Sequence, residues 1–444
     1  MSRASPTGIK VIVIGAGFGG LAAAIECIRQ GHEVEIFEQA PEFLPLGDLI
    51  VLTPNGTRIV STWDDVLPKI MHQCLWVDAM EIHRASGELL HKQEWQNSYQ
   101  GAPFCMGQRS FYQKTLVDFA ESLGIKIHLN TRVEEHFETE HKAGIIVDGV
   151  RHEADVLIGA DGIRSRCRTF VTGQTDDPQG SGYAVFRAWF PLDQVKDPII
   201  DEWKDSGKDE YHLFIGEDLH AFILTCPTLN MAVYAFTHKD TFDAKESYTQ
   251  IDHVLQASEG WDPRFRAFVK ATPEGRLVDW KLLWRDPFRP WVSKGGRVII
   301  AGDAAHPFLP TSGNGAVQAI EDGASIAYVL RRGGRENIPL ALRVHEALRY
   351  ERVTLSQRIG FETRHRFHKT KWEKLAEDPS AVNMPQPAWQ YSHDPVQYAA
   401  EKLDEAVADV LEGKPLQSTN VAPGHVHKDW TVAELMALGS ETID

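Results

Sequence analysis

The sequence lacks any long uninterrupted apolar segment. No stretch of the chain approaches the roughly eighteen uncharged apolar residues that mark a membrane-spanning helix. The first apolar run, residues 11–14, ends at a glycine and is far too short for the core of a signal peptide. We therefore expect a cytoplasmic protein that is neither secreted nor inserted into a membrane.

The sequence is also short of positive charge. Its 46 Lys and Arg residues stand against 62 Asp and Glu residues, a formal net charge of -16. Nucleic acids and anionic membrane surfaces both require a basic footprint on the protein, so neither is expected as a partner. Neutral or cationic small molecules remain as expected ligands, and the sequence carries no signal for an oligomeric state.

Cysteines are few, and they do not occur in closely spaced pairs. Cys27, Cys74, Cys105, Cys167 and Cys226 form no CxxC motif. This pattern suggests neither a zinc site nor a disulfide framework. We expect reduced thiols and predict no metal site.

The length and composition are those of an ordinary globular protein. The chain has 444 residues, of which 43% are hydrophobic and 24% charged. Because single cores stop growing at about 250 to 300 residues, two or three domains are expected.

The amino-terminal stretch combines a strand, a glycine-rich turn, a helix and a second strand. Residues 10–14 have the pattern of a buried strand, GAGFGG occupies residues 15–20, and a second strand pattern at residues 34–37 ends in Glu38. This is the GxGxxG pattern in the context that dinucleotide binding requires. In that context Gly15 permits a tight turn, Gly17 admits a pyrophosphate, and Gly20 lets helix and strand pack closely. Glu38 is placed to accept the hydroxyls of an adenosine ribose, which favours FAD or NAD.

A late stretch, VIIAGDAAHPFLPTSGNGAVQAIED at residues 298–322, carries a second strand-to-helix turn. The strand ends at Gly302 and Asp303, whose carboxylate can hold a sugar hydroxyl. After a Gly313-Asn314-Gly315 turn, a helical pattern begins at Ala316. Such a helix aims unpaired N–H groups and partial positive charge at a ring that becomes anionic when reduced.

Further signals lie between these two motifs. Residues 156–162 form a buried strand that closes on an acidic turn at Asp161. Short strands at residues 125–129, 133–137 and 143–147 suggest a small meander. Arg109 precedes a helical pattern, where it either reaches a phosphate or remains a surface arginine.

The three motifs GAGFGG, ADVLIGADGIRSRCR and RVIIAGDAAHPFLPTSGNGAVQAIEDG, in this order, resemble the single-component, class A flavin-dependent monooxygenases. This group includes salicylate hydroxylase-like enzymes and many fungal secondary-metabolism hydroxylases, and the resemblance covers roughly residues 8–360. It implies an α/β fold in which a Rossmann-like FAD-binding domain carries an inserted antiparallel β-sheet substrate domain, followed by a helical C-terminal region.

The resemblance also implies a domain division and a set of site residues. The FAD-binding domain would comprise residues 1–75, 100–175 and 290–360, the substrate domain residues 76–99 and 176–289, and the C-terminal region residues 361–444. The ADP half of FAD would be held by Gly15, Gly17, Gly20 and Glu38, with Arg109 and Asp161 along the pyrophosphate and the Val133 backbone at the adenine. Asp303 would hold the ribityl chain, and Gly313, Gly315 and Ala316 would face the isoalloxazine.

The chain departs from the family pattern at two points. The usual glycine-glutamine-glycine is Gly313-Asn314-Gly315, which keeps the backbone geometry. Where many salicylate hydroxylase-like members have glycine-alanine-glycine, this chain has Gly47-Asp48-Leu49, which argues against a simple salicylate as substrate. Asp48 is a candidate for contact with the cofactor and for catalysis. A turn or helix-cap aspartate is an equally good reading of it.

On the substrate side, residues 183–190, 211–215, 220–225 and 231–237 indicate an antiparallel sheet that would roof the pocket. Within it, Arg187 is the first candidate for orienting or protonating a substrate. The alternative is an arginine on the polar face of a strand. Tyr211, His212 and Tyr234 are weaker candidates, for which structural roles are favoured.

Aromatic and basic residues complete the list of candidates. Trp203, Trp280, Trp284 and Trp291 are candidates for the lining of a flat apolar pocket, although core packing explains them equally well. Past residue 360, Arg364, Arg366, Lys369, Lys371 and Lys374 predict a basic helix face. A solvated face is favoured there over a docking patch for the nicotinamide phosphate.

The function implied by the resemblance is a monooxygenase with tightly bound FAD and with NADPH or NADH as a transient co-substrate. O2 would form a flavin C4a-hydroperoxide, which hydroxylates or epoxidises an electron-rich aromatic or indole-like small molecule in natural-product or aromatic metabolism. The protein would supply position, electrostatics and exclusion of water. Two alternatives remain: a FAD-dependent oxidase or dehydrogenase that needs no nicotinamide, and a non-catalytic flavin-binding redox sensor.

Overall fold

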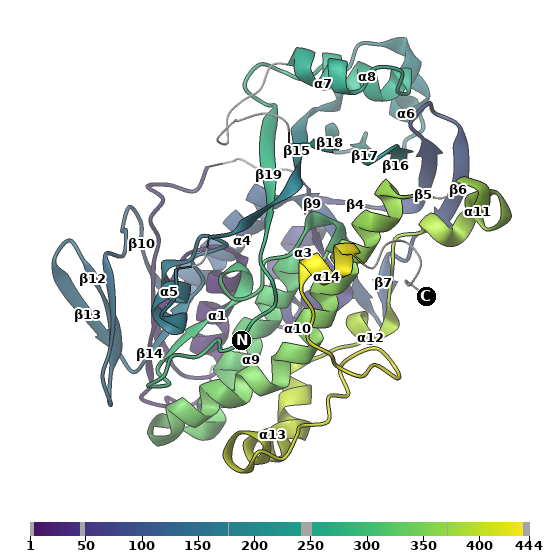
Figure 1. The fold of residues 1–444 in the computed structure, drawn as a ribbon. Helices are drawn as coiled ribbons and strands as arrows, with labels where there is room; N and C mark the ends of the chain where they lie inside the picture. The colour runs from purple at the N-terminus through teal and green to yellow at the C-terminus, as the bar shows by residue number, and fades with distance from the viewer. Residues whose placement is uncertain (1–3, 45–48, 176, 241–250, 371, 438–444) are drawn as a thin grey trace.

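Two large β-sheets of different construction organise the molecule (Figure 1). The computed structural model describes residues 4–44, 49–175, 177–240, 251–370 and 372–437. In this part of the chain a parallel sheet lies beside the long helices, and a larger sheet forms the opposite end. The fold is therefore the expected mixed α/β fold, with a Rossmann-like region, a separate antiparallel sheet and a helical C-terminal part.

The parallel sheet has five strands in the order β10-β2-β1-β14-β20. They are β1 (Lys10–Ile14), β2 (Glu33–Phe37), β10 (Lys126–His128), β14 (Val156–Gly159) and β20 (Val298–Ile300). Strands β1, β14 and β20 are buried almost throughout, as expected where helices cover both faces of a sheet. The prediction that residues 125–129 join the small meander is wrong. Strand β10 pairs with β2, because the preceding helix returns the chain to the sheet edge as a crossover.

Helices of the amino-terminal and late segments pack directly on one another. Helix α9 (Gly315–Gly333) crosses α1 (Phe18–Arg29) at Gly323, where an added Cβ would lie 2.5 Å from the Ala23 nitrogen. Only glycine permits this approach of the two backbones. Helix α10 (Ile338–His368) follows along α9, and α13 (Pro395–Glu412) packs against both (Figure 1).

The larger sheet has seven strands in the order β19-β15-β18-β17-β16-β5-β6. They are β5 (Val77–Arg84), β6 (Leu89–Glu94), β15 (Gln179–Pro191), β16 (Asp209–Gly216), β17 (Leu219–Cys226), β18 (Met231–Lys239) and β19 (Val278–Trp284). The four predicted strands lie within β15 to β18. All pairings are antiparallel except that of β16 with β5. Strands β5 and β6 thus belong to one sheet with β15 to β19, although the domain boundaries themselves remain a proposal.

Shorter elements connect these layers. They are β3 (Leu49–Leu52), α2 (Pro54–Val60), α3 (Val66–Met71), β4 (Cys74–Leu75), β7 (Ser98–Tyr99), β8 (Ala102–Pro103), β9 (Cys105–Gln108), α4 (Arg109–Ser122), β11 (Glu135–Glu138), β12 (Ala143–Val147), β13 (Val150–Ala154), α5 (Arg166–Thr172), α6 (Asp201–Asp205), α7 (Ile251–Ala257), α8 (Pro263–Lys270), α11 (Trp372–Glu377), α12 (Ala388–Tyr391) and α14 (Val432–Ala437). Strands β11 to β13 form the predicted meander, without β10.

The predicted basic helix face is solvated only in part, because Lys369 is exposed but Arg364 is buried. Arg364 is only 3% exposed, and Arg366 donates a hydrogen bond to the Asn383 carbonyl. Lys369 forms an ion pair with Asp218. Lys371 lies outside the described residues, and the Lys374 side chain is not described. The prediction is wrong for Arg364 because the larger sheet and the C-terminal segment cover this end of α10, a tertiary effect that charge spacing along a helix does not reveal.

A buried ionic network ties α9 to α10. Arg352 makes two hydrogen bonds to Glu321, each 2.9 Å long, and Arg349 contacts both Glu321 and Asp322. Asp322 also accepts from His306 Nε2 at 2.6 Å and from the Gly302 amide at 3.0 Å. Burial alone would raise the pKa of both carboxyls, but Arg352 and Arg349 hold the pKa of Glu321 well below its usual range, and His306 and Arg349 do the same for Asp322.

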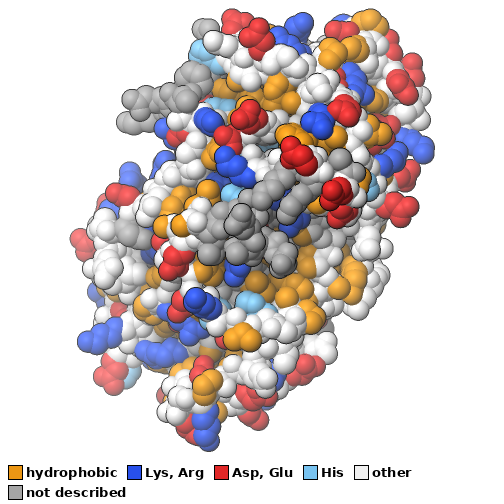
Figure 2. Space-filling model, turned by 45° about the vertical axis from the view of Figure 1, so that its right-hand side comes forward, with side chains coloured by type: hydrophobic (Ala, Val, Ile, Leu, Met, Phe, Trp, Pro, Cys, Tyr) orange, Lys and Arg blue, Asp and Glu red, His pale blue; other side chains and the backbone are white. Residues whose placement is uncertain are grey.

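On the face seen in Figure 2, acidic and basic side chains are interspersed. Among the helices of the described residues, none has the length and apolar character needed to cross a bilayer.

The ionic network predicts a strong effect of Arg349→Met. This substitution leaves Glu321 and Asp322 with too few partners in a buried site, which is expected to lower the free energy of unfolding by about 3 to 5 kcal/mol. Urea unfolding measures this loss. Arg358→Met, which removes a half-exposed ion pair with Glu362 on the same helix, serves as the control and is expected to cost less than about 1 kcal/mol. Equal losses in the two variants would contradict the assignment.

Buried histidines predict a loss of stability in acid. Burial lowers the pKa of His212 and His368 to about 2, of His345 to about 3 and of His220 to about 4. These side chains stay neutral in the folded protein but take up protons in the unfolded chain near pH 6.5. Their contribution is therefore complete above pH 6.5 and decreases as the pH falls toward the folded pKa values, by about 1.4 kcal/mol per pH unit for each histidine.

The measurement is the change in unfolding free energy between pH 7 and pH 5. His345→Gln is expected to show a smaller decrease than the unsubstituted protein, since one titrating group is gone. His141→Gln, at an exposed position, is the control and is expected to keep the original decrease. An unchanged pH dependence in the His345 variant would contradict a lowered pKa of this histidine in the folded protein.

Candidate active site

One pocket of about 470 Å³ lies between the parallel sheet and the larger sheet. One side, the backbone-rich side, consists of glycine-containing turns at residues 17–19, 160, 162, 301–303 and 310–316. The other side is built from side chains of β15 to β19, of α10 and of the segment at residues 384–391. The pocket therefore joins the glycine-rich turns to the inner face of the larger sheet.

The glycines of the first turn have different roles. Gly15 has a φ of +96°, and a Cβ there would lie 2.4 Å from the Ala160 carbonyl oxygen. A Cβ at Gly20 would lie 1.9 Å from the Gly15 carbonyl oxygen, so the prediction that Gly20 allows close packing is confirmed. Gly17 lines the pocket at the start of α1, and a Cβ there would meet no atom within 4 Å. The space above Gly17 is open to a ligand.

Glu38 is held by backbone amides at the end of β2. Its Oε2 accepts a hydrogen bond from the Ala16 amide at 2.7 Å, and its Oε1 accepts one from the Ala40 amide at 2.8 Å. The carboxylate is thereby fixed beside the glycine turn, although it is not part of the pocket lining. Its contact with a ribose stays a prediction.

Arg109 and Asp303 face the same pocket from different elements. Arg109 begins α4 and is exposed, and Asp303 follows β20 with its side chain open toward the pocket. Dense surrounding protein raises the pKa of the Asp303 carboxyl, while His306 and Arg109 oppose that shift. A cation and a carboxylate thus stand together at the backbone-rich side.

Asp161 and Val133 are engaged elsewhere in the fold. Asp161 accepts hydrogen bonds from the Ser165 hydroxyl and from the amides of Arg166 and Cys167, which fixes the start of α5. The Val133 carbonyl accepts from Arg166 Nη1 at 3.0 Å. Neither residue lines the pocket, whereas Ala160 and Gly162 on either side of Asp161 do. Their proposed cofactor contacts remain predictions.

The late turn presents the amino terminus of α9 to the pocket. Gly313 has a φ of +59°, α9 begins at Gly315, one residue before the expected start, and Gly313, Gly315 and Ala316 all line the pocket. The Asn314 side chain is 2% exposed and turns inward, where its Oδ1 accepts from Gln318 Nε2 at 3.1 Å. The departure from the family's glutamine therefore places an amide in the core. Asp48, the other departure, lies outside the described residues.

Arg187 lies on the inner face of the larger sheet. It is half-buried on β15, lines the pocket, and its guanidinium carbon is 4.9 Å from the centre of the Trp280 ring. Of the four tryptophans considered, Trp280 is a lining residue. Trp203 and Trp291 are buried in separate hydrophobic cores, and Trp284 packs on Phe361. The sequence did not reveal the remaining aromatic lining, which comprises Phe18, Trp95, Phe104, Phe222, Phe308, Phe367 and Tyr391 beside Tyr211.

The weaker candidates Tyr211, His212 and Tyr234 differ in whether they reach the pocket. Tyr211 lines the pocket, whereas His212, the next residue along β16, points to the opposite face of the sheet and stacks on Trp203 with ring centres 4.0 Å apart. The Tyr234 hydroxyl is hydrogen bonded to Thr272 and does not reach the pocket. Structural roles therefore hold for His212 and Tyr234.

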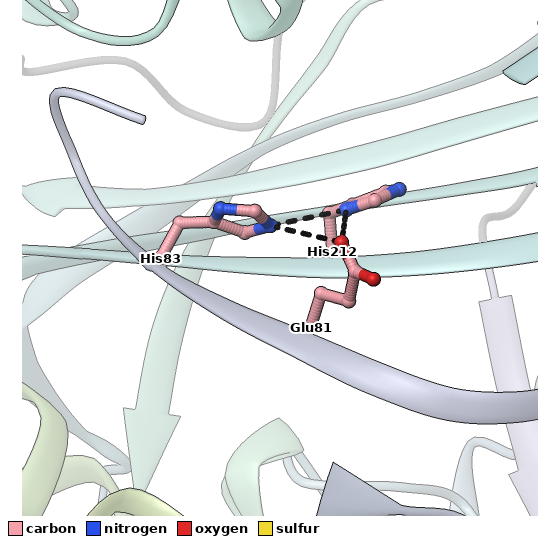
Figure 3. A group of neighbouring side chains, drawn as sticks. All are labelled: Glu81, His83 and His212. Atoms are coloured by element: carbon pink, nitrogen blue, oxygen red, sulfur yellow. Dashed lines mark hydrogen bonds and ion pairs between the residues drawn. The ribbon is translucent and has the colours of Figure 1, made fainter. Parts of the chain in front are cut away.

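Glu81, His83 and His212 meet on this opposite face (Figure 3). The facing nitrogens of the two imidazoles are 3.2 Å apart, and Glu81 Oε2 lies 3.7 Å from His83 and 3.6 Å from His212. Burial lowers the pKa of both histidines, and so does the nearby Arg264 cation. Since that cation also opposes a metal ion, we assign the group to the pairing of β5 with β16. The absence of a metal site stays a prediction.

Three buried polar residues of the lining were also missed by sequence analysis. His220 Nε2 is 3.2 Å from the Thr237 hydroxyl, and both residues line the pocket beside Arg364. Their inward position follows the same alternation that places Arg187, because Thr237 is opposite Val185, two residues before Arg187 on β15. Strand parity was thus a usable signal for His220 and Thr237. No comparable signal marked Arg364.

Comparisons with known proteins match this architecture. Residues 8–336 match the family model described as FAD binding domain. The chain is 33% identical to the FAD-dependent monooxygenase fsr3 of Gibberella fujikuroi, over 98% of this chain and 87% of that protein. It is also 33% identical to the asperlicin C monooxygenase of Petromyces alliaceus, over 93% of this chain and 94% of that protein.

A solved structure extends the comparison to a cofactor complex. CtdE, crystallised with FAD and a substrate, is 32% identical and superposes with a TM-score of 0.85, over 90% of this chain and 99% of CtdE. These matches span both large sheets and agree with the motifs from which the resemblance was drawn. The chain belongs to the class A FAD-dependent monooxygenases of fungal secondary-metabolism type.

Proposed function

We propose that this FAD-dependent monooxygenase uses NADPH or NADH and O2 to hydroxylate or epoxidise an electron-rich aromatic or indole-like small molecule. The observation that carries the proposal is the single pocket in which a backbone-rich, glycine-containing side faces an aromatic side that contains Arg187. The first side suits a dinucleotide and the second suits a flat organic substrate. Asperlicin C monooxygenase, named for a natural product, supports a substrate of that kind.

The backbone-rich side fits FAD. The open space at Gly17, the amino terminus of α1 and the fixed Glu38 carboxylate suit the ADP half. In this proposal Arg109 binds the pyrophosphate, Asp303 the ribityl chain and residues 313–316 the isoalloxazine, and the pocket lining that they share supports these roles. When bound, FAD supplies the redox chemistry, which is acceptance of a hydride from the nicotinamide and transfer of one oxygen atom from O2.

The chain's own groups set the electrostatics of the reaction. The amino terminus of α9 directs N–H groups and partial positive charge at the pocket, where they stabilise negative charge. The aromatic lining excludes water. Arg187 carries several N–H donors at the substrate side and is proposed to orient a substrate oxygen. Asp48, beyond the described residues, remains proposed for proton transfer.

The test is substrate-dependent oxygenation by the purified protein. With a panel of phenols, salicylates and indoles, NADPH or NADH, and ¹⁸O2, we expect a product that is heavier by one labelled oxygen atom. Mass spectrometry detects the label, and loss of absorbance at 340 nm follows the nicotinamide. Product formation without nicotinamide would instead favour the oxidase or dehydrogenase. A yellow protein without turnover on any substrate would favour the redox sensor.

Gly17→Ala separates cofactor binding from folding. Gly17 has a φ of -75° and open space at its Cβ position, so alanine fits the protein itself. A methyl group at this turn would obstruct a pyrophosphate, and we expect FAD affinity to fall at least about tenfold, or about 1.4 kcal/mol, with little change in the melting temperature of the apoprotein. FAD fluorescence titration measures the affinity.

Gly180→Ala is the matched control. Gly180 also has open space for a Cβ and no positive φ, but it lies on β15 away from the glycine turn. This variant is expected to bind FAD as the unsubstituted protein does. Normal FAD affinity in the Gly17 variant would rule out close approach of the cofactor at this residue.

A further inference from the structure

Arg364 is a buried cation that lines the pocket with an unused donor. Its side chain is 3% exposed, and its Nη1 has no hydrogen-bond partner among the described residues. Its Nη2 donates to the Met436 sulfur at 3.3 Å, a weak acceptor. Its guanidinium carbon is otherwise near two ring faces, 5.3 Å from the centre of Tyr183 and 5.5 Å from that of Phe361.

Other arginines on α10 show what a buried guanidinium ordinarily requires. Arg349 and Arg352, both almost fully buried, are each bonded to carboxylates. For Arg364 the described residues provide no such partner within ion-pair distance. An unpaired buried charge costs several kcal/mol, and burial accordingly lowers the pKa of Arg364. A ligand that supplies the missing negative charge would recover this energy on binding.

The groups around Arg364 do not neutralise it. His220 accompanies it on the pocket wall and is neutral, since burial and then the Arg364 cation lower the pKa of His220 to about 4. Its Nδ1 is 2.9 Å from His368 Nε2, and its Nε2 is 3.2 Å from the Thr237 hydroxyl. This chain of neutral groups holds the wall in place and leaves Arg364 Nη1 as the strongest donor there.

Two arginines lie on the substrate side of the pocket. Arg187 and Arg364 both line it, and Asp303, at the backbone-rich side, is the acidic residue among the described lining residues. On the sheet, Thr237 pairs with His220 and Ala235 with Phe222, so Arg187, opposite Ala235, lies one row of side chains away from the His220 wall. The chain as a whole has a formal net charge of -16, so these two side chains are opposite in sign to the overall charge.

We propose that Arg364 binds an anionic oxygen of the substrate, either a phenolate or enolate oxygen or a carboxylate, at the end of the pocket formed with His220 and Thr237. This inference rests on the proposed function, because it assigns the substrate class of the same site. It differs from the expectation of a neutral or cationic ligand. Held by Arg364, a flat substrate would lie along the aromatic lining with its far end toward Arg187 and the backbone-rich side.

The experiment measures binding of matched charged and neutral probes to the FAD-loaded protein. The pairs are 2-naphthoate with 2-naphthamide, and 4-nitrophenolate with 4-nitroanisole at pH 8, titrated by isothermal calorimetry. The unsubstituted protein is expected to bind at least one anion about tenfold or more tightly than its neutral partner. The carboxylate and phenolate arms decide which oxygen is preferred.

Variants assign that selectivity to Arg364. Arg364→Gln is expected to lose most of the preference for the anion while binding the neutral probe within about threefold of the unsubstituted protein, and Arg364→Lys is expected to keep part of the preference. Arg358→Gln, on the same helix but outside the pocket, is the control and is expected to change neither. If Arg364→Gln fails to take up FAD, the Arg364→Lys protein carries the test, and its preference must still fall below that of the unsubstituted protein.

The proposal is overturned if the unsubstituted protein does not favour either anion, or if the Arg364 variants weaken charged and neutral probes equally. Calorimetry reports these outcomes whether or not oxygenation occurs. Failure of the proposed function, seen as the absence of labelled product with intact anion binding, is thereby distinguished from failure of this inference.

Discussion

The buried network of Glu321 and Asp322 with Arg349 and Arg352 is the constraint on which the site depends. It joins α9 to α10, and through the Asp322 contacts with Gly302 and His306 it also fixes the turn that carries Asp303. The amino terminus of α9 and the Asp303 carboxylate are thereby positioned by one set of interactions. Rotation of α9 about its axis would break several charge-assisted bonds at once. The network therefore holds α9, α10 and the turn at Asp303 in one relative orientation.

Close backbone approach is the second condition. Gly20 against Gly15, Gly15 against Ala160 and Gly323 against α1 leave no room for a Cβ. These contacts draw the first turn, the second turn and α9 together, and they leave the space above Gly17 open. The pocket therefore has a glycine-rich side, which suits the proposed cofactor, and a side rich in larger side chains, which suits the proposed substrate.

Sequence reasoning succeeded where chemistry is local. The strand-turn-helix patterns at Gly15 and Asp303 depend on neighbouring residues, and both turns were located to within a residue. It failed where tertiary packing decides the outcome. Strand β10 belongs to the parallel sheet and not to the meander, and Arg364 was taken for a surface residue. Helix spacing showed a basic face but not the C-terminal segment that covers it.

The parallel pairing of β5 with β16 has a consequence for how the molecule is made. Strand β5 is synthesised more than a hundred residues before β16, its neighbour in the sheet. Until β16 leaves the ribosome, that side of β5 has no strand to pair with and offers a template for incorrect association. The larger sheet is thus completed late and through contacts between residues distant in sequence, which slows folding. Until then the nascent chain depends on protection of the unpaired edge of β5.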